Sequence, residues 1–328
     1  MKAFITGATG FIGTNLIQEL VKAGWDIIAI HRENSDVSEL KKYPGITLLM
    51  GDILDIESLR RAIPENVDAV FHVAGSVGHL PHSAEKTRYG VNQVGTRNVV
   101  NVALEKHIGR FIYTSTVLTY DFRAQQPLTE NAPRNLWTTD AYMQSKRLSD
   151  EEVDKGLAAG LDVVYMHPSA VFGAYDKATW SKIFLEIKRG LPLPVAPPGG
   201  LSACHAREVA KAHVTAFHQA KRGRHYLLGG PDVSLLEIMQ EVARILKRPE
   251  PKIKLPKFIF KAYGWAEFLI STHLMKRDPM LTPHTIDMLC NTIYSDSSLA
   301  IQELGYQPST LREMLEDCHQ WMVSSNML

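Results

Sequence analysis

The chain has few cysteines and no excess of charge of one sign. Its three cysteines, Cys204, Cys290 and Cys318, have neither the spacing of a metal site nor that of a disulfide framework, which favours a reducing compartment, the cytoplasm. Lysine and arginine total 36 and aspartate and glutamate total 35, so the formal net charge of +1 provides no bulk field that attracts nucleic acid. We therefore expect a small-molecule partner, no nucleic acid and no metal.

Long apolar runs are also missing. The N-terminus lacks the apolar core and the small-residue cleavage site of a signal peptide, which argues against export. The most apolar late segment, FIFKAYGWAEFLIS, contains Lys261 and Glu267 and is too short and too charged to span a bilayer. We expect no stable membrane insertion. Three interpretations of the amphipathic segment 257–275 remain open: a core helix, the wall of an apolar pocket, or a peripheral membrane contact.

Strand-like and helix-like patterns alternate through the first half of the chain. Short runs rich in Ile, Val and Phe, such as KAFITG, DIIAIHR and DAVFHVAG, are separated by helical patterns. This alternation predicts an α/β fold, a doubly wound parallel sheet of the Rossmann type with helices on both faces. We expect this domain over residues 1–173, with 203–230 returning to it. Residues 174–202 and 231–328 are expected to form a smaller, mostly helical, substrate-binding cap, which begins near the loop GLPLPVAPPGG.

Three glycines lie where the first strand gives way to a helix. Gly7, Gly10 and Gly13 are spaced three apart in TGATGFIG. Such a junction presents unpaired N–H groups and the positive end of the helix dipole to a pyrophosphate, and glycine lets the phosphate approach the main chain. The pattern predicts a dinucleotide site, although many dehydrogenases have the spacing G-x-G-x-x-G instead.

The end of the second strand bears on which dinucleotide is bound. An acidic residue there accepts hydrogen bonds from the adenosine ribose, whereas a cation holds the additional 2′-phosphate. This strand ends in His31 and Arg32. A charge-assisted pair with Arg32 contributes about 1.5 to 3 kcal/mol, or about one to two powers of ten in affinity. We therefore expect NADP (NADPH), with NAD less favoured.

Tyr142 and Lys146 stand four apart in YMQSK, on one face of an expected helix. The ordinary phenol pKa of about 10 is too high for an efficient proton donor at neutral pH. One ammonium at about 5 Å contributes roughly 3 kcal/mol at an effective dielectric of about 20, which is near two pKa units. Upstream, the strand RFIYTST ends in three hydroxyls, and one of them can orient a substrate carbonyl at the carboxyl edge of the sheet; they are Thr114, Ser115 and Thr116.

The motifs occur in one order over almost the whole chain: TGATGFIG, GDILD, FHVAG, VNQVGTRNVV, YTST, YMQSK, HPSAVFG and IQELGYQPSTLREML. In this order they resemble the extended short-chain dehydrogenases/reductases, the NAD-dependent epimerase/dehydratase superfamily, and HPSAVFG is similar to the dihydroflavonol 4-reductase branch. The resemblance implies an NAD(P)-dependent oxidoreductase that acts on CH–OH or C=O groups and forms a homodimer.

The resemblance also implies roles for individual residues. The catalytic residues that it implies are Thr116, which orients the substrate, Tyr142, the proton donor, and Lys146, which binds the cofactor ribose and lowers the pKa of the tyrosine. Ser115 stays an alternative to Thr116. The expected cofactor-binding residues are Gly7, Thr9, Gly10, Phe11, Ile12, Gly13, Arg32, Asp52, Ile53, Val73, Ala74, Gly75, Asn92, Thr114, Tyr142, Lys146, Pro168 and Val171. The expected substrate contacts are Ser76, His79, Thr116 and Phe172.

Three functions follow. The first is NADPH-dependent reduction of a ketone or aldehyde to an alcohol, with the hydride from NADPH and the proton from Tyr142. The second is a nucleotide-sugar epimerase or dehydratase that keeps NAD bound. It is less favoured because Ala170 stands where the sugar enzymes have asparagine, and because Val117 and Leu118 stand where dehydratases have an Asp-Glu pair. The third, a non-catalytic NADP sensor, is disfavoured because such proteins typically lack the Tyr and Lys pair.

Overall fold

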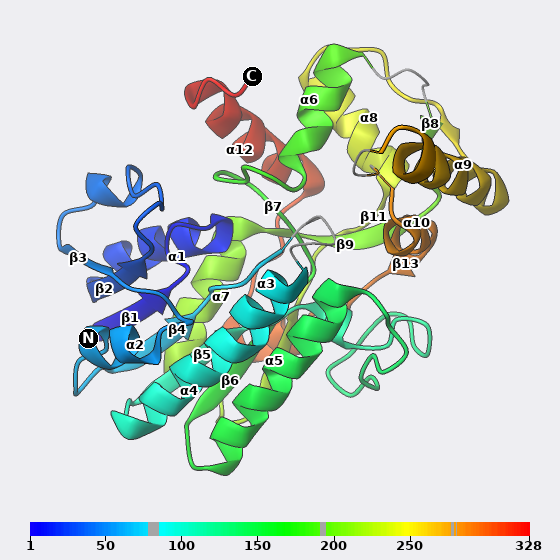
Figure 1. Ribbon diagram of the computed structural model, residues 1–328. Helices are drawn as coiled ribbons and strands as arrows, with labels where there is room; N and C mark the ends of the chain where they lie inside the picture. The colour runs from blue at the N-terminus through cyan, green and yellow to red at the C-terminus, as the bar shows by residue number, and fades with distance from the viewer. Residues whose placement is uncertain (78–84, 191–194, 277–278, 280) are drawn as a thin grey trace.

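The computed structural model describes residues 1–328 except 78–84, 191–194, 277–278 and 280. Within the described residues, seven parallel strands form one sheet in the order β10-β6-β5-β4-β1-β2-β3 (Figure 1). The strands are β1 (Lys2–Thr6), β2 (Asp26–His31), β3 (Ile46–Met50), β4 (Ala69–His72), β5 (Arg110–Thr114), β6 (Val163–Pro168) and β10 (His225–Leu228). The order reverses between β1 and β4, so the crevice for a ligand lies at the carboxyl ends of these two strands.

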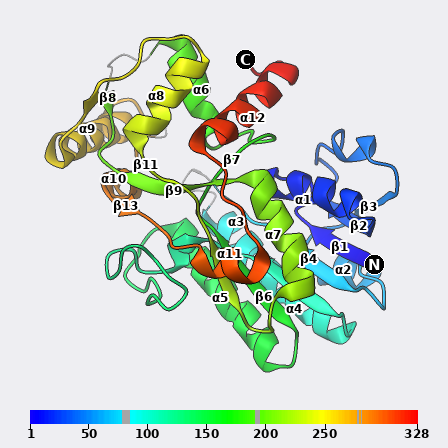
Figure 2. The ribbon, with the colours of Figure 1, turned by 180° about the vertical axis from the view of Figure 1, so that it is seen from behind.

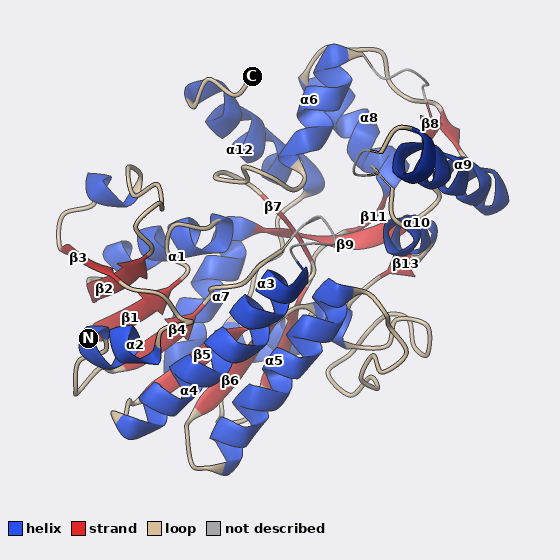
Figure 3. Ribbon diagram, viewed as in Figure 1, coloured by secondary structure: helices blue, strands red, loops and turns tan. Residues whose placement is uncertain are grey.

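Helices cover both faces of this sheet (Figure 3). On one face lie α1 (Phe11–Lys22) and α7 (Ala206–Gln219), and on the other lie α2 (Ile56–Ala62), α4 (Thr96–Glu105) and α5 (Ala141–Ala158). Short segments complete this part: η1 (Leu40–Lys42), α3 (Glu85–Tyr89), the π-helical turn η3 (Gly90–Gly95) and η4 (Val117–Thr119). Each helix buries an apolar stripe against the strands, with Leu16 and Ile17 of α1 and Val99 of α4 fully buried. The expected doubly wound, Rossmann-type fold is confirmed.

The rest of the chain builds a second, smaller layer. A mixed sheet contains β7 (Ala170–Phe172), β9 (Gly200–His205), β11 (Asp232–Ser234) and β13 (Thr292–Ile293), and a two-stranded sheet contains β8 (Val195–Ala196) and β12 (Ile253–Lys254). The helices are α6 (Ser181–Arg189), α8 (Leu235–Ile245), α9 (Lys257–Leu269), the π-helical turn η5 (Ile270–Leu274), α10 (Pro283–Cys290) and α12 (Leu311–Ser324). Phe184, Ile238 and Met314 form a core between α6, α8 and α12, separate from that of the large sheet.

The path of the chain crosses between the two layers. β10 pairs with β6 at the edge of the large sheet, and α7 packs beside α1. Helix α11 (Ser298–Leu304) lies against α7 and β10, as seen from behind in Figure 2. Its residues Ala300 and Leu304 and the following Tyr306 are buried in the same cluster as α1. The apolar side of this short helix thus completes the core of the large sheet, although residues 231–328 are expected to belong to the cap.

Candidate active site

The glycine turn between β1 and α1 forms one wall of the crevice at the carboxyl ends of β1 and β4. Gly7 has a φ of +77°, and a Cβ there would lie 2.5 Å from the backbone nitrogen of Ala74. A Cβ on Gly13 would lie 2.1 Å from the carbonyl oxygen of Gly7. The N–H of Gly10 donates to the Gly7 carbonyl at 3.0 Å, and α1 begins after Gly10 with no side chain capping its free N–H groups. Only glycine fits this turn, and the exposed N–H groups suit the pyrophosphate of a dinucleotide.

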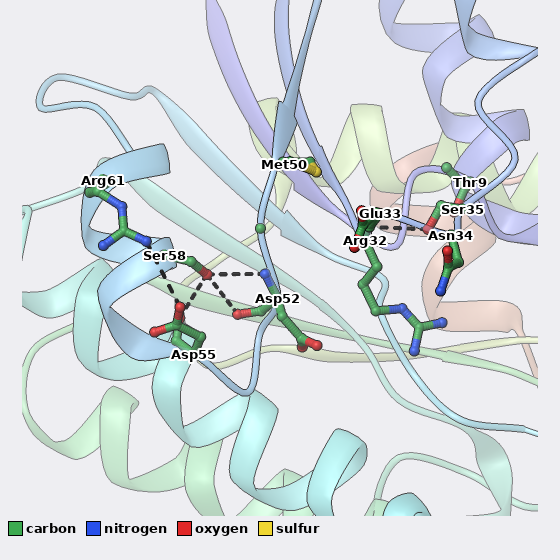
Figure 4. A pocket seen from close by; sticks show the side chains of 11 residues that line it. Thr9, Arg32, Glu33, Asn34, Ser35, Met50, Asp52, Asp55, Ser58 and Arg61 are labelled. Atoms are coloured by element: carbon green, nitrogen blue, oxygen red, sulfur yellow. Dashed lines mark hydrogen bonds and ion pairs between the residues drawn. The ribbon is translucent and has the colours of Figure 1, made fainter.

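A cavity of about 710 Å³ opens beside this turn, beyond the ends of β2 and β3 (Figure 4). Its lining includes the expected residues Thr9, Arg32 and Asp52. The other lining residues were not predicted from the sequence; they are Glu33, Asn34, Ser35, Met50, Gly51, Asp55, Ser58 and Arg61. The cavity has both signs of charge, and Arg61 is 3.8 Å from Asp55. Arg32 is exposed, and its N–H donates to the Ser35 hydroxyl at 3.2 Å. This cavity has the volume and donors to receive an adenosine with a phosphate.

Asn92 ties the loop after β4 to the catalytic helix. Its side-chain oxygen accepts the N–H of Ser76 at 2.7 Å, and its amide donates to the Ser76 carbonyl at 3.1 Å and to the Ser145 hydroxyl at 2.8 Å. Asn92 is buried in η3, a π-helical turn of the kind that often marks functional sites. These bonds hold Val73, Ala74 and Gly75 at the crevice beside the glycine turn.

Thr116 and Tyr142 meet at the carboxyl edge of the sheet. Thr116 follows β5, and Tyr142 lies in the first turn of α5, which the Asp140 carboxylate caps by accepting the N–H of Met143 at 2.8 Å. Burial raises the pKa of the Tyr142 phenol to about 12. A hydrogen bond from the Thr116 hydroxyl acts in the opposite direction, because it favours the phenolate. Ser115 instead donates to the Asp150 carboxylate at 2.6 Å. Of the two candidate hydroxyls, Thr116 is therefore the one beside the phenol.

Lys146 lies one turn along α5 and is almost fully buried. Its ammonium donates to the Tyr113 hydroxyl at 3.0 Å and to the Thr114 carbonyl at 2.9 Å. Burial lowers the pKa of Lys146 to about 8, while the charge of Asp150 acts in the opposite direction. The ammonium is expected to act on the Tyr142 phenol through its charge, and its own hydrogen bonds go to Tyr113 and Thr114.

Lys146 starts a chain of buried hydrogen bonds. An ammonium can only donate, so the Tyr113 hydroxyl accepts from Lys146 and donates its own proton to Ser149 Oγ at 2.7 Å. Ser149 then donates to Thr96 Oγ1 at 2.9 Å. With Lys146 as the donor at one end, the arrangement in which every proton of the row has an acceptor runs in one direction.

The same chain continues to the glycine turn. Thr96 Oγ1 is 2.8 Å from His72 Nε2, and His72 Nδ1 is 2.7 Å from Thr6 Oγ1. In the one-directional arrangement Thr96 donates to Nε2, and the imidazole proton on Nδ1 is donated to Thr6. Thr6 Oγ1 also accepts the N–H of Ala74 at 3.4 Å. Burial, and then the charge of Lys146, lowers the pKa of His72 to about 3, so the imidazole is neutral. The Lys146–Thr6 chain thus connects the catalytic helix to the residue before Gly7.

Three charged groups near the site were missed in the sequence. Asp150, one turn beyond Lys146, is buried and forms an ion pair with Arg134 at 3.2 Å. Burial raises the pKa of Asp150, although Arg134 and Lys146 oppose this. The buried guanidinium of Arg88 lies 6.0 Å from the centre of the Tyr142 ring, and its charge lowers the phenol pKa. The four-residue spacing of Lys146 and Asp150 is the only sequence signal for this cluster.

The remaining expected site residues have varied surroundings. Ile53 is buried against Gly95, and Thr114 Oγ1 is 2.8 Å from His213 Nε2 in the interior. Phe172 is buried in the cap core, where its ring stacks on Trp180 with centroids 4.8 Å apart. That packing argues against Phe172 as a substrate contact. His79 lies outside the described residues.

The chain was compared with known proteins. Residues 3–229 match the model of the NAD dependent epimerase/dehydratase family. The "Putative dihydroflavonol 4-reductase" of Synechocystis sp. is 29% identical over 327 residues, which cover 97% of this chain and 93% of that protein. The "Sterol demethylase protein B" of Methylococcus capsulatus is 26% identical over 337 residues, which cover all of both chains. The crystal structure of gox2253 superposes with a TM-score of 0.86 at 27% identity and covers 99% of each chain.

Within the described residues, no cluster of histidine, cysteine and carboxylate side chains could hold a metal ion. The glycine turn, the Tyr142 and Lys146 pair and the family match agree on one class of enzyme, an oxidoreductase that uses a nicotinamide dinucleotide on CH–OH or C=O groups. This chain belongs to the NAD dependent epimerase/dehydratase family, the extended branch of the short-chain dehydrogenases/reductases.

Proposed function

We propose that this protein is an NADPH-dependent reductase that converts a ketone or an aldehyde to an alcohol. The observation that carries the proposal is the placement of Thr116, just after β5, and of Tyr142 and Lys146, one turn apart on α5, at the carboxyl edge of the sheet. When bound, the reduced dinucleotide supplies the hydride. The residues of the chain then supply the proton and hold the carbonyl group.

Tyr142 is the proton donor of this proposal. Because burial keeps the phenol protonated at neutral pH, Tyr142 is ready to protonate the oxygen as the carbonyl becomes an alkoxide, which is a stronger base than tyrosinate. Thr116 donates a hydrogen bond to the same oxygen and so orients it. The positive charge of Arg88 stabilises the phenolate that is left.

The glycine turn and the adjoining cavity support NADP as the cofactor. Gly7 and Gly13 leave room for a pyrophosphate where any Cβ would collide with the main chain. Arg32 lies in the cavity where the 2′-phosphate of NADP would be bound, whereas Glu33 in the same lining would suit the ribose of NAD. Lys146 would hold the nicotinamide ribose. The preference for NADP thus rests on Arg32.

The residues after Thr116 argue against the sugar-nucleotide alternative. Val117 is buried among Tyr120 and Leu128, so no carboxylate follows Thr116 to assist an elimination. Ala170, at the start of β7, has no side-chain donor for a diphosphate. The relative from Synechocystis sp. is described as a reductase, which supports the same preference.

The test is a screen that follows NADPH absorbance with aldehydes, β-keto acyl compounds, flavanonols and ketosteroids. We expect turnover of at least one class by the wild-type protein and little by the Tyr142→Phe variant. Mass spectrometry of the nucleotide carried through purification is the complement. Tightly retained NAD without consumption of NADPH would instead indicate an epimerase, and binding of NADPH without turnover of any compound would indicate a sensor.

We also propose a homodimer, on the basis of the resemblance to extended reductases that pair through the helix with the catalytic tyrosine and its neighbour. Here these helices are α5 and α4, which pack side by side. Sedimentation at the mass of one chain across micromolar concentrations would contradict this arrangement. The three cysteines are free and buried, which supports the expectation of a reducing compartment.

A further inference from the structure

Exposed large apolar side chains are concentrated in one stretch of the cap. Nine of them lie between residues 253 and 275, each 43% to 79% exposed: Ile253, Phe258, Ile259, Tyr263, Trp265, Leu269, Ile270, Leu274 and Met275. We call these nine side chains the α9 patch. Single exposed apolar residues are ordinary on a protein surface, but a continuous group of this size marks an interaction surface.

The fold turns this apolar side of the helix outward. The inner side of α9 packs on α10, because Phe260 lies in a small core with Ile286 and Cys290, and a Cβ on Gly264 would lie 2.6 Å from Ile286. At about 100° per residue, the outward-facing half of the helix contains Phe258, Ile259, Trp265 and Leu269, and exposed Tyr263 lies near its border. A helix on the surface of a domain normally has polar residues on that side, whereas this one is apolar on both sides.

Exposed lysines surround the α9 patch: Lys252, Lys254, Lys257, Lys261 and Lys276. The two carboxylates of the same stretch are engaged within the cap. Glu250 pairs with Arg244 at 2.9 Å, and Glu267 accepts from Ser271 at 2.7 Å and from the N–H of Leu281 at 3.1 Å. Asp287 lies 3.8 Å from Lys261 and offsets part of its charge. The other four lysines give the rim of the patch a net positive charge.

The positive charge around the α9 patch distinguishes between the possible partners of this surface. A second copy seated on the patch by two-fold symmetry would bring the same lysines close to each other, at a cost in repulsion. A role as the wall of a described cavity is not supported, because neither the cavity beside Arg32 nor the smaller one between Trp137 and α10 includes a residue of α9. An anionic lipid surface matches both the apolar side chains and the lysines.

We propose that the α9 patch docks on a bilayer that contains anionic lipid, with α9 lying in the plane of the interface. In such a helix the apolar side enters the boundary of the acyl chains, Trp and Tyr side chains lie at the level of the headgroups, and lysines at the flank contact the phosphates. None of the described helices is long and apolar enough to cross a membrane. Attachment is therefore peripheral, and it does not depend on the reaction proposed above.

The experiment is flotation of the full-length protein with vesicles of phosphatidylcholine alone or mixed with phosphatidylglycerol. We expect binding to the mixed vesicles, a blue shift of Trp265 fluorescence and weaker binding at high salt. The double variant Phe258→Ser and Leu269→Ser should weaken vesicle binding by about tenfold or more. Its matched control is Leu136→Ser and Val323→Ser, since these residues are 76% and 50% exposed, compared with 74% and 48% for Phe258 and Leu269, and lie outside the patch.

A second pair of variants tests the charge. Lys257→Glu and Lys261→Glu together should weaken binding to the anionic vesicles by about tenfold or more, whereas Lys41→Glu and Lys221→Glu, exposed elsewhere, should not. The proposal is overturned if no vesicle binds the wild-type protein. It is also overturned if Phe258→Ser and Leu269→Ser convert a dimer to a monomer without changing vesicle binding, because the patch would then belong to a second copy.

Discussion

The ammonium of Lys146 lies 3.0 Å from the hydroxyl of Tyr113, one turn along the helix from the phenol that it is expected to assist. Tyr113 is fully buried near the carboxyl end of β5, so this bond fixes where the positive charge is held. The chain thus uses a second tyrosine to position the lysine.

Replacing Tyr113 by Phe removes one of the two acceptors of the Lys146 ammonium, leaving the Thr114 carbonyl, and deprives Ser149 of the Tyr113 donor. We expect a loss of about 1 to 3 kcal/mol in the free energy of unfolding and a shift in the pH profile of kcat/KM. Tyr165→Phe is the control, because its buried hydroxyl donates to Asp154 away from the site. It should lose stability while keeping the pH profile. Identical profiles for both variants would remove Tyr113 from the positioning of Lys146.

Replacing Tyr142 by Phe removes the proposed proton donor. We expect kcat to fall by about 100-fold or more, with the affinity for NADPH nearly unchanged, as measured by steady-state kinetics and fluorescence titration. Tyr120→Phe is a matched control, since within the described part of the chain its buried hydroxyl has no hydrogen-bond partner. Full activity of the Tyr142 variant would exclude it from the mechanism.

The pKa of Lys146 predicts opposite effects of pH on activity and on stability. Activity should fall above about pH 8, where Lys146 loses its charge. The folded pKa of about 8 is lower than the ordinary 10.5, so between these values the unfolded chain binds more protons and the free energy of unfolding rises with pH. The full difference is about 3 kcal/mol. Chemical unfolding at pH 7.5 and 9.5 should show about 2 kcal/mol of this rise. The rise should be absent in Lys146→Met, and a wild-type stability that falls over this range would contradict the assignment.

Replacing Arg32 by Asp should move the preference from NADP toward NAD by about one to two powers of ten in kcat/KM, because a charge-assisted hydrogen bond to the 2′-phosphate is lost. Arg60→Ala is the control, as Arg60 pairs with Glu57 and Glu105 and does not line the cavity. An unchanged ratio of the two cofactors in the Arg32 variant would refute the phosphate assignment.

Replacing Gly7 by Ala tests the turn directly. The new Cβ meets the Ala74 backbone at 2.5 Å, so we expect loss of measurable dinucleotide binding and a clear drop in melting temperature. Gly24→Ala separates the two causes, because Gly24 has a similar φ of +72° and open space around its Cβ position. It should cost only the backbone strain, about 1 to 2 kcal/mol, and leave cofactor binding intact.

The fold and the centre of the site could be predicted because their signals are local. A strand, a glycine turn and a helix follow one another in TGATGFIG, and Tyr142 and Lys146 share one helix. The pairing of Asp150 with Arg134 and the position of Arg88 could not be predicted, because these residues come from separate segments that meet only through packing. The hydrogen bond from Lys146 to Tyr113 could not be predicted for the same reason, since Tyr113 lies on β5.

The row of hydrogen bonds from Lys146 to Thr6 has one further consequence. Its members come from α5, β5, α4, β4 and β1, so one continuous set of polar contacts joins five elements on both sides of the crevice. All of these groups are buried, and removing any one of them leaves a neighbour without its partner, at a cost of about 1 to 3 kcal/mol. The separation between the catalytic helix and the glycine turn is thereby set by polar contacts as well as by apolar packing.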